Sequence, residues 1–370
     1  MRINFSKREL TIVLKKVAPI SSDVQKKPKH IFLLYFLLIF LSLLTWFLYF
    51  RNNVTLSYND ARSHLNISRR VVESLQPGLA QLGTVWLPLQ HILQLPTIGW
   101  DVMYRTGLSG SLISMASFVF SSIFIFYISL ELGFSELVAY VVVLAFSSNQ
   151  NILYLQSTPM TESLLICMFL GIVFYYIKWL RDRKIMNLVL CAAFSFLAGL
   201  TRYDGWFIIC ATSVAVLIAV LWSDSFKKVV SSVYIYTSLA MYSVVTWLVW
   251  NKIIFGNWLF FILGPYSAKA QQDILYSRGL LPTKSNLFYS LKTLYYASIF
   301  NIGYPLVIIG FIGFLFLMFT KKDKVFKTIL IILLSPIIFN LVSLYFGHSV
   351  IHLFTYQTYI LIIGLMCATE

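Results

Sequence analysis

Long apolar runs recur along this chain, and they restrict its fold more than any other feature. Most runs are close to the roughly 20 residues that an α-helix needs to cross the hydrocarbon core of a bilayer. Hydrophobic residues make up 59% of the chain and charged residues 12%, about half the charged share of a soluble domain. The alternating segments of a membrane β-barrel are absent from the sequence. The sequence therefore predicts an all-α, polytopic transmembrane protein.

We predict about ten spans, with the N-terminus in the cytoplasm. The predicted spans are 31–50, 107–130, 137–153, 163–178, 186–200, 206–222, 229–250, 297–319, 328–346 and 352–368. They divide the chain into a basic cytoplasmic segment, 1–30, and a transmembrane module, 31–370. The two longest polar stretches of the module, 51–106 and 251–292, are the predicted large outer loops.

Positive charge sets the predicted orientation, because Lys and Arg concentrate in the cytoplasmic loops of membrane proteins. Eight of the 29 Lys and Arg residues lie in 1–30, and further clusters lie at 178–184, 227–228 and 321–327. Alternation of the predicted spans places all of these clusters on the cytoplasmic side. The net charge of +15 therefore reflects topology and contact with anionic membrane lipids, and no nucleic-acid partner is predicted.

The first outer loop is too long for a plain connector. Residues 59–75 carry apolar and polar side chains on opposite sides of a helix, and Pro77 and Gly78 end this pattern. We predict an amphipathic helix lying in the headgroup plane. A second short apolar segment, 85–95, follows it. The second outer loop contains GNWLFFILGPYSAKAQ, whose aromatic residues suit the membrane interface.

Ionisable side chains are scarce inside the predicted spans and gather on one face. Alternation places Asp60, Glu162, Asp204 and His348 on the outer side, although none of them was used to orient the chain. Proton-coupled transporters and ion channels usually carry ionisable groups at mid-membrane depth. The pattern therefore favours chemistry at the outer surface over translocation.

Five short motifs resemble those of one group of membrane enzymes. They are YNDARSHL (58–65), QLGTVWLPL (81–89), STPMTESL (157–164), LTRYDGW (200–206) and GPYSAKAQ (264–271). With a first helix, a long outer loop and many further spans, they resemble the GT-C superfamily of integral-membrane glycosyltransferases. Within it the chain is similar to bacterial and archaeal relatives of dolichyl-phosphate-mannose protein mannosyltransferases. The resemblance implies sugar transfer from a polyprenyl-phosphate donor to a protein, lipid or glycan acceptor, on the extracytoplasmic face of the plasma membrane.

Asp60 and Glu162 are the predicted catalytic residues. The family uses an acid of the first outer loop near the acceptor, and Asp60 matches that position. The family often carries a second, adjacent acid, where this chain has Asn59; Asp101 is another acid of the same loop. Asp60 would deprotonate the acceptor hydroxyl, which would then attack the anomeric carbon opposite the phosphate and invert it. The alternatives are structural: Asp60 could cap a helix, and Glu162 could complement a helix dipole.

Seven further residues are predicted to bind substrate. They are His64, Arg202, Asp204, Tyr266, Lys269, Arg278 and His348. His64 is one helical turn from Asp60, so both can face one site. Arg202 could hold the donor phosphate through bidentate contacts, or it could pair with Asp204 and only pin the turn between them.

The sequence assigns no cofactor, and the identity of any metal stays open. His348 and His352 are one turn apart and could bind a divalent ion, and Mg²⁺ or Mn²⁺ could assist departure of the phosphate. The four cysteines have no metal-binding spacing. No Walker loop or dinucleotide-binding glycine motif occurs, which favours a lipid-linked donor over a nucleotide sugar.

Two other functions compete with the transferase. A transporter or lipid flippase predicts charged or broken helices at mid-membrane, which the sequence does not indicate. A noncatalytic subunit of an envelope-polysaccharide assembly system would tolerate replacement of Asp60 and Glu162.

Overall fold

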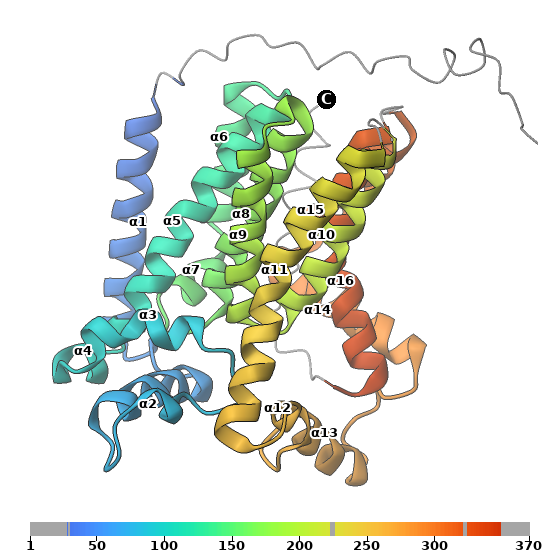
Figure 1. Cartoon of the computed structure of the whole chain (residues 1–370). Coiled ribbons are helices and arrows are strands. Elements are labelled where there is room, and N and C mark those ends of the chain that lie inside the picture. The colour runs from blue at the N-terminus through green and yellow to red at the C-terminus, as the bar shows by residue number, and fades with distance from the viewer. Residues whose placement is uncertain (1–27, 29, 223–225, 321–323, 349–370) are drawn as a thin grey trace, which may run out of the picture.

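The computed structural model describes residues 28, 30–222, 226–320 and 324–348, and every regular element in these ranges is a helix (Figure 1). The all-α prediction is therefore confirmed for the described chain. In order, the elements are α1 (Ile31–Arg51), α2 (Asn59–Glu73), the 3-10 helix η1 (Leu79–Leu82), α3 (Leu89–Ile98), α4 (Asp101–Arg105), α5 (Leu108–Glu131), α6 (Glu136–Ser147), α7 (Gln150–Gln156), α8 (Glu162–Asp182), α9 (Ile185–Thr201), α10 (Asp204–Leu221), α11 (Phe226–Phe255), α12 (Phe260–Leu263), α13 (Ala268–Ser277), α14 (Leu287–Ile302), α15 (Tyr304–Thr320) and α16 (Lys324–Phe346).

Six described helices are long and apolar enough to cross a membrane: α1, α5, α8, α10, α11 and α16. Two sharply bent helix pairs raise the number to eight if each pair is one span. The apolar helix α9 has 17 residues and packs between α8 and α11. The predicted span 352–368 lies outside the described residues. The described chain thus supports a polytopic membrane protein with six to eight spans, fewer than the predicted ten.

The predicted span 137–153 is not one helix. The chain breaks at Ser148 and Asn149, and α6 and α7 meet at an angle of 69°. Asn149 causes the break, because its side chain accepts hydrogen bonds from the backbone N–H groups of Asn151 and Ile152 and so starts a new helix. Asn149 also donates a 2.8 Å hydrogen bond to the carbonyl oxygen of Asn301.

The predicted span 297–319 is also wrong as a single helix. Helices α14 and α15 meet at 111° around Gly303, whose φ of +88° only glycine adopts readily. Pro305 follows in the first turn of α15, where its missing N–H costs nothing. The first break falls in the polar run SSNQN, 147–151, and the second falls beside Asn301, Gly303 and Pro305, so neither lies in continuously apolar sequence.

Helix α5 fixes the position of the linker that leads into α8. Its first turns bury small side chains, which let neighbouring backbones come close. Ser111 donates a hydrogen bond of 3.0 Å to the carbonyl oxygen of Ser157, and Ser114 one of 3.2 Å to that of Met160. A Cβ atom on Gly110 would lie 2.3 Å from the Cβ atom of Pro159. The 157–161 linker is therefore held against α5, and it leads directly into Glu162.

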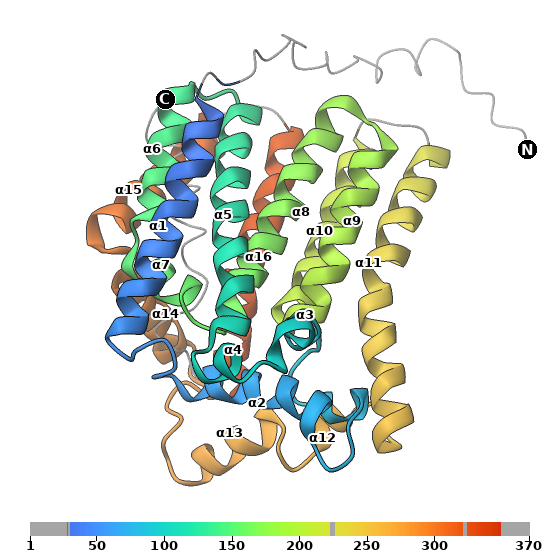
Figure 2. The same ribbon diagram turned by 90° about the vertical axis from the view of Figure 1, so that its left-hand side faces the viewer.

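Helices α2, α3, α4, α12 and α13 gather at one end of the bundle, which we call the α2 end (Figures 1 and 2). Helix α2 confirms the predicted amphipathic helix over 59–75, with its end two residues earlier. The second predicted segment, 85–95, begins later as α3, because Pro88 is its N-cap and residues before it form an irregular link to α11. Helices α11 and α16 begin at the opposite end, close to basic clusters of the sequence (Figure 2). Which side of the membrane the α2 end faces stays a prediction.

We expect Gly110→Ala to destabilise the protein, because its methyl group would collide with the rigid ring and backbone of Pro159. The expected loss is about 1–3 kcal/mol in the free energy of unfolding. Thermal or denaturant unfolding in detergent micelles measures it. Gly99→Ala is the matched control, since the nearest atom to a Cβ there lies 3.9 Å away. Equal stability of the two variants would show that α5 and the linker are not in close contact.

Candidate functional site

Asp60 lies at the start of α2, half-buried at the α2 end of the bundle. The helix N-cap is Tyr58, and no side chain caps this helix, so the alternative prediction that Asp60 is an N-cap is wrong. The Asp60 carboxylate forms no hydrogen bond or ion pair with any other described residue. An unpaired carboxylate in a partly buried position is free to accept a proton from a ligand.

Tyr58 connects Asp60 to the core of the site. Its ring packs against Leu155 and Met160 from the chain that precedes α8. The pKa of Tyr58 is raised to about 12, mainly by burial and also by the charges of Asp60 and Glu162, while Arg202 opposes the rise. The phenol therefore stays protonated and can donate a hydrogen bond. Tyr58 thus lies within electrostatic reach of Glu162 at the start of α8 and of Arg202 in the α9–α10 turn.

Arg202 joins three polar side chains in what we call the Arg202 bridge. Its Nη1 atom lies 2.9 Å from the Glu162 Oε1 atom and 2.9 Å from the Thr161 Oγ1 atom. Its Nε atom lies 3.2 Å from the Asp204 Oδ2 atom. The side chains of Glu162 and Asp204 are only 10% and 7% exposed, so the guanidinium compensates charge that is largely excluded from water. The sequence predicted that these residues share one end, and the structure brings three of them into contact.

One carboxylate oxygen of Glu162 takes no part in the Arg202 bridge. Glu162 is the first residue of α8, where a negative charge also complements the helix dipole. Its Oε2 atom is buried and has no hydrogen-bond partner among the described residues. A buried acceptor without a donor is costly, so a ligand hydroxyl or a water molecule at this point would be stabilised.

His64 faces a second histidine that the sequence did not single out. The His64 Nδ1 and His91 Nε2 atoms are 2.9 Å apart, and the Trp86 ring lies 4.6 Å from the His64 ring. Burial lowers the pKa of His91 to about 3, with a further contribution from the charge of Arg70. Burial, His91 and Arg202 also lower the pKa of His64. Both rings are therefore neutral, and they hold α2 against α3.

The sequence pattern of α3 could have predicted the contact of His91 with α2. Gln90, His91 and Gln94 fall on one side of an otherwise apolar helix, and all three are fully buried. The Gln94 Oε1 atom accepts a 2.8 Å hydrogen bond from Ser68 of α2. Buried polar groups usually pair with one another, so this spacing indicated a polar contact with α2.

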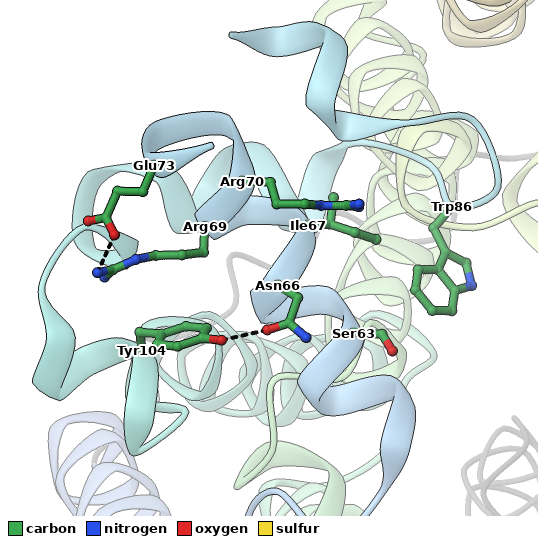
Figure 3. A pocket seen from close by; sticks show the side chains of 8 residues that line it. All are labelled: Ser63, Asn66, Ile67, Arg69, Arg70, Glu73, Trp86 and Tyr104. Carbon is green, nitrogen blue, oxygen red and sulfur yellow. Dashed lines mark hydrogen bonds and ion pairs between the residues drawn. The ribbon is translucent and has the colours of Figure 1, made fainter. Parts of the chain in front are cut away.

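An open pocket of about 550 Å³ lies on the outer side of α2 (Figure 3). Its walls come from α2, from α4 and from the chain before α3. The lining residues are Ser63, Asn66, Ile67, Arg69, Arg70, Glu73, Trp86 and Tyr104. From the sequence we expected Arg69 and Arg70, which lie on the polar side of the amphipathic helix, only to contact anionic lipid headgroups, and no pocket was predicted there.

The remaining predicted binding residues lie apart from the Arg202 bridge. Tyr266, Lys269 and Arg278 are exposed in the α12–α13 region. None of their side chains bonds to a described residue of the bridge. His348 is exposed after α16, with its ring stacked 6.2 Å from that of Phe346. These residues share the α2 end with Asp60, and no described contact joins them to it.

The described residues contain no group of three or more His, Cys, Asp or Glu side chains that could hold a metal ion. Arg202 already pairs with two of the three carboxylates near the site. The described part of the site therefore does not fit a divalent ion. His352, the predicted partner of His348, lies outside the described residues.

Neither the protein-family models nor the curated protein sequences contain a match to this chain.

We expect Arg202→Gln to lower the free energy of unfolding by about 2 kcal/mol, because it removes the ion pairs of the guanidinium with two buried carboxylates. Adding Glu162→Gln should recover part of the loss, since it removes one of these charges. Denaturant unfolding of both single variants and the double variant gives the coupling energy. Strictly additive losses would contradict the bridge.

The buried histidine pair should make stability fall in acid. An unfolded histidine binds a proton below its ordinary pKa of 6.5, whereas folded His91 stays neutral until about 3. The unfolded state therefore gains protons first, and stability drops as the pH falls between these values. We expect the stability advantage of wild type over His91→Gln to shrink by up to about 1.4 kcal/mol per pH unit between pH 6 and 4. Carboxylates titrate in both proteins, so a constant difference would contradict the neutral pair.

Proposed function

We propose that this protein is a membrane glycosyltransferase that moves a sugar from a polyprenyl-phosphate donor to an acceptor hydroxyl on the extracytoplasmic face, with inversion. One observation carries the proposal: at the end of an apolar helical bundle, Tyr58 feels the charges of Glu162 and Arg202 and also that of Asp60, whose carboxylate has no partner among the described residues. Such an end receives a lipid-linked substrate from the bilayer and a polar substrate from water.

Asp60 is the proposed base. Its carboxylate takes the proton of the acceptor hydroxyl, and the oxygen attacks the anomeric carbon from the face opposite the phosphate. The bond between that carbon and the phosphate oxygen breaks, and polyprenyl phosphate leaves with the bonding electrons. The Tyr58 hydroxyl, kept protonated by its raised pKa, stabilises the negative charge near Asp60 before proton transfer.

Glu162 and Arg202 are proposed to bind the donor. The unpartnered Oε2 atom of Glu162 accepts a hydrogen bond from a sugar hydroxyl. Arg202 places positive charge near the departing phosphate, although two of its nitrogen atoms are already bonded to carboxylates. Its contribution is therefore electrostatic, and Glu162 fixes the sugar in place.

The GT-C resemblance also stays a proposal. An apolar bundle that carries helices of a long first loop at one end agrees with it, and so does the acid at position 60. The single acid is a departure, because Asn59 occupies the neighbouring position. One base is enough for the inverting reaction described above.

Lipid or sugar translocation is the second candidate, because the structure shows broken helices that the sequence did not indicate. The two bent pairs meet where Asn149 and Asn151 donate hydrogen bonds to Asn301. Transporters commonly place polar, discontinuous helices at their transport site. Translocation would leave the Asp60 carboxylate at the α2 end without a role, so we place the transferase first.

The decisive test is turnover of polyprenyl-phosphate donors that carry a labelled hexose or pentose, with transfer to water also counted. We expect Asp60→Asn to lower the rate at least about a hundredfold with unchanged folding, because the base is lost. Asp273→Asn is the control, since Asp273 is an exposed acid paired with Lys284 in the second large loop. Equal rates in both variants would remove Asp60 from the mechanism. Donor scrambling in vesicles that survives Asp60→Asn would favour translocation.

A further inference from the structure

The pocket on α2 contains one arginine that forms several bonds and one that has no hydrogen-bond or ion-pair partner among the described residues. Arg69 donates to the Ile98 carbonyl oxygen at 2.7 Å, to Asp101 at 2.6 Å, and lies 2.5 Å from Glu73. Arg70 is exposed and forms no ion pair or hydrogen bond within the described chain. Two adjacent arginines thus have different tasks: Arg69 holds α4 against α2, and Arg70 presents its charge to the pocket.

The other walls of the pocket supply polar and aromatic surface. Arg70 extends from α2 toward the side of the pocket where Trp86 lies (Figure 3). Ser63 and Asn66 lie on the same side of α2, and Tyr104 donates a 2.6 Å hydrogen bond to Asn66. A cation, a large rigid ring and short hydroxyl and amide groups match a carbohydrate that carries a negative charge.

The position of the pocket separates it from a lipid substrate. Helix α2 lies beyond α3 and α4 as seen from the bundle, in both views (Figures 1 and 2). The inward side of α2 is buried, with Ala61, His64 and Ser68 facing the protein. The pocket is therefore reached from water, whereas a polyprenyl chain would approach through the bundle side.

The pocket and the proposed base lie on the same helix. Ser63, one of the lining residues, follows Asp60 by three residues, about one turn of α2, and Asp60 itself does not line the pocket. Arg70 follows Asp60 by ten residues, which corresponds to about 15 Å along the helix. A molecule that bridges the two residues must be elongated, with its anionic group at one end and its reactive hydroxyl at the other.

We propose that the acceptor is a phosphorylated oligosaccharide that enters from the aqueous side, with its phosphate on Arg70, a sugar ring against Trp86 and its reactive hydroxyl at Asp60. This assignment of acceptor class rests on the proposed function. The binding of a phosphorylated oligosaccharide to the pocket is independent of that function, because binding can be measured without a donor and without turnover.

The test is calorimetric titration of the full-length protein in nanodiscs of phosphatidylcholine, with phosphorylated maltotriose, maltotriose and inorganic phosphate as probes. We expect the phosphorylated sugar to bind wild type about tenfold more tightly than either other probe, because only it reaches both Arg70 and the ring. Arg70→Gln should remove this preference. Arg62→Gln should keep it, since Arg62 does not line the pocket and bonds to the Leu56 carbonyl oxygen.

Three results would overturn the proposal: no preference of wild type for the phosphorylated sugar, equal behaviour of Arg70→Gln and Arg62→Gln, or loss of probe binding when the discs contain phosphatidylglycerol. The last result would assign Arg70 to a lipid headgroup. Failure of the proposed function is distinguishable. If Asp60→Asn keeps full donor turnover while Arg70→Gln loses probe binding, the proposed role of Asp60 in a transferase is wrong and the proposed binding site in the pocket is supported. If Asp60 is essential and Arg70→Gln binds normally, only the acceptor assignment falls.

Discussion

The compensation of two buried carboxylates by one guanidinium is the constraint on which the site depends. Glu162 begins α8 and Asp204 begins α10, and both are nearly excluded from water. Charges in such a place are tolerated only when paired. Arg202 pairs with both because it occupies the tight turn between α9 and α10 in an extended conformation. Three helix ends are thereby fixed relative to one another, and α2 packs beside them on α3 and η1.

Small and polar side chains inside the bundle fix the position of that site. The serines of α5 hold the 157–161 linker, and Gln156 at its start accepts from Ser42 and donates to Thr45 of α1. Apolar surface gives helices in a bilayer little reason to prefer one partner, so such hydrogen bonds and close approaches decide the arrangement. The helices of the first predicted outer loop pack at this end of the bundle, and the His64–His91 contact fixes the orientation of α2 relative to α3.

Two kinds of polar feature coexist in this bundle and suggest different chemistry. The asparagines at the bent helix pairs satisfy backbone groups exposed by the breaks, as any broken helix in a membrane requires. The Arg202 bridge lies at the α2 end and leaves a carboxylate oxygen without a donor. The second feature has a buried carboxylate oxygen without a hydrogen-bond partner among the described residues, which is why it is assigned to the proposed reaction.

The sequence by itself determined the all-α membrane class, the amphipathic helix α2 and the grouping of Asp60, Glu162 and Asp204 at one end, because hydropathy, helical period and alternation of spans are local or additive properties. The tertiary structure decided the angles at which the helices meet around Asn149 and Gly303, because hydropathy does not set how two successive helices are oriented. It also decided which polar groups touch. Arg202 and Glu162 are 40 residues apart and His64 and His91 are 27 apart, and packing alone brings their side chains within hydrogen-bond distance.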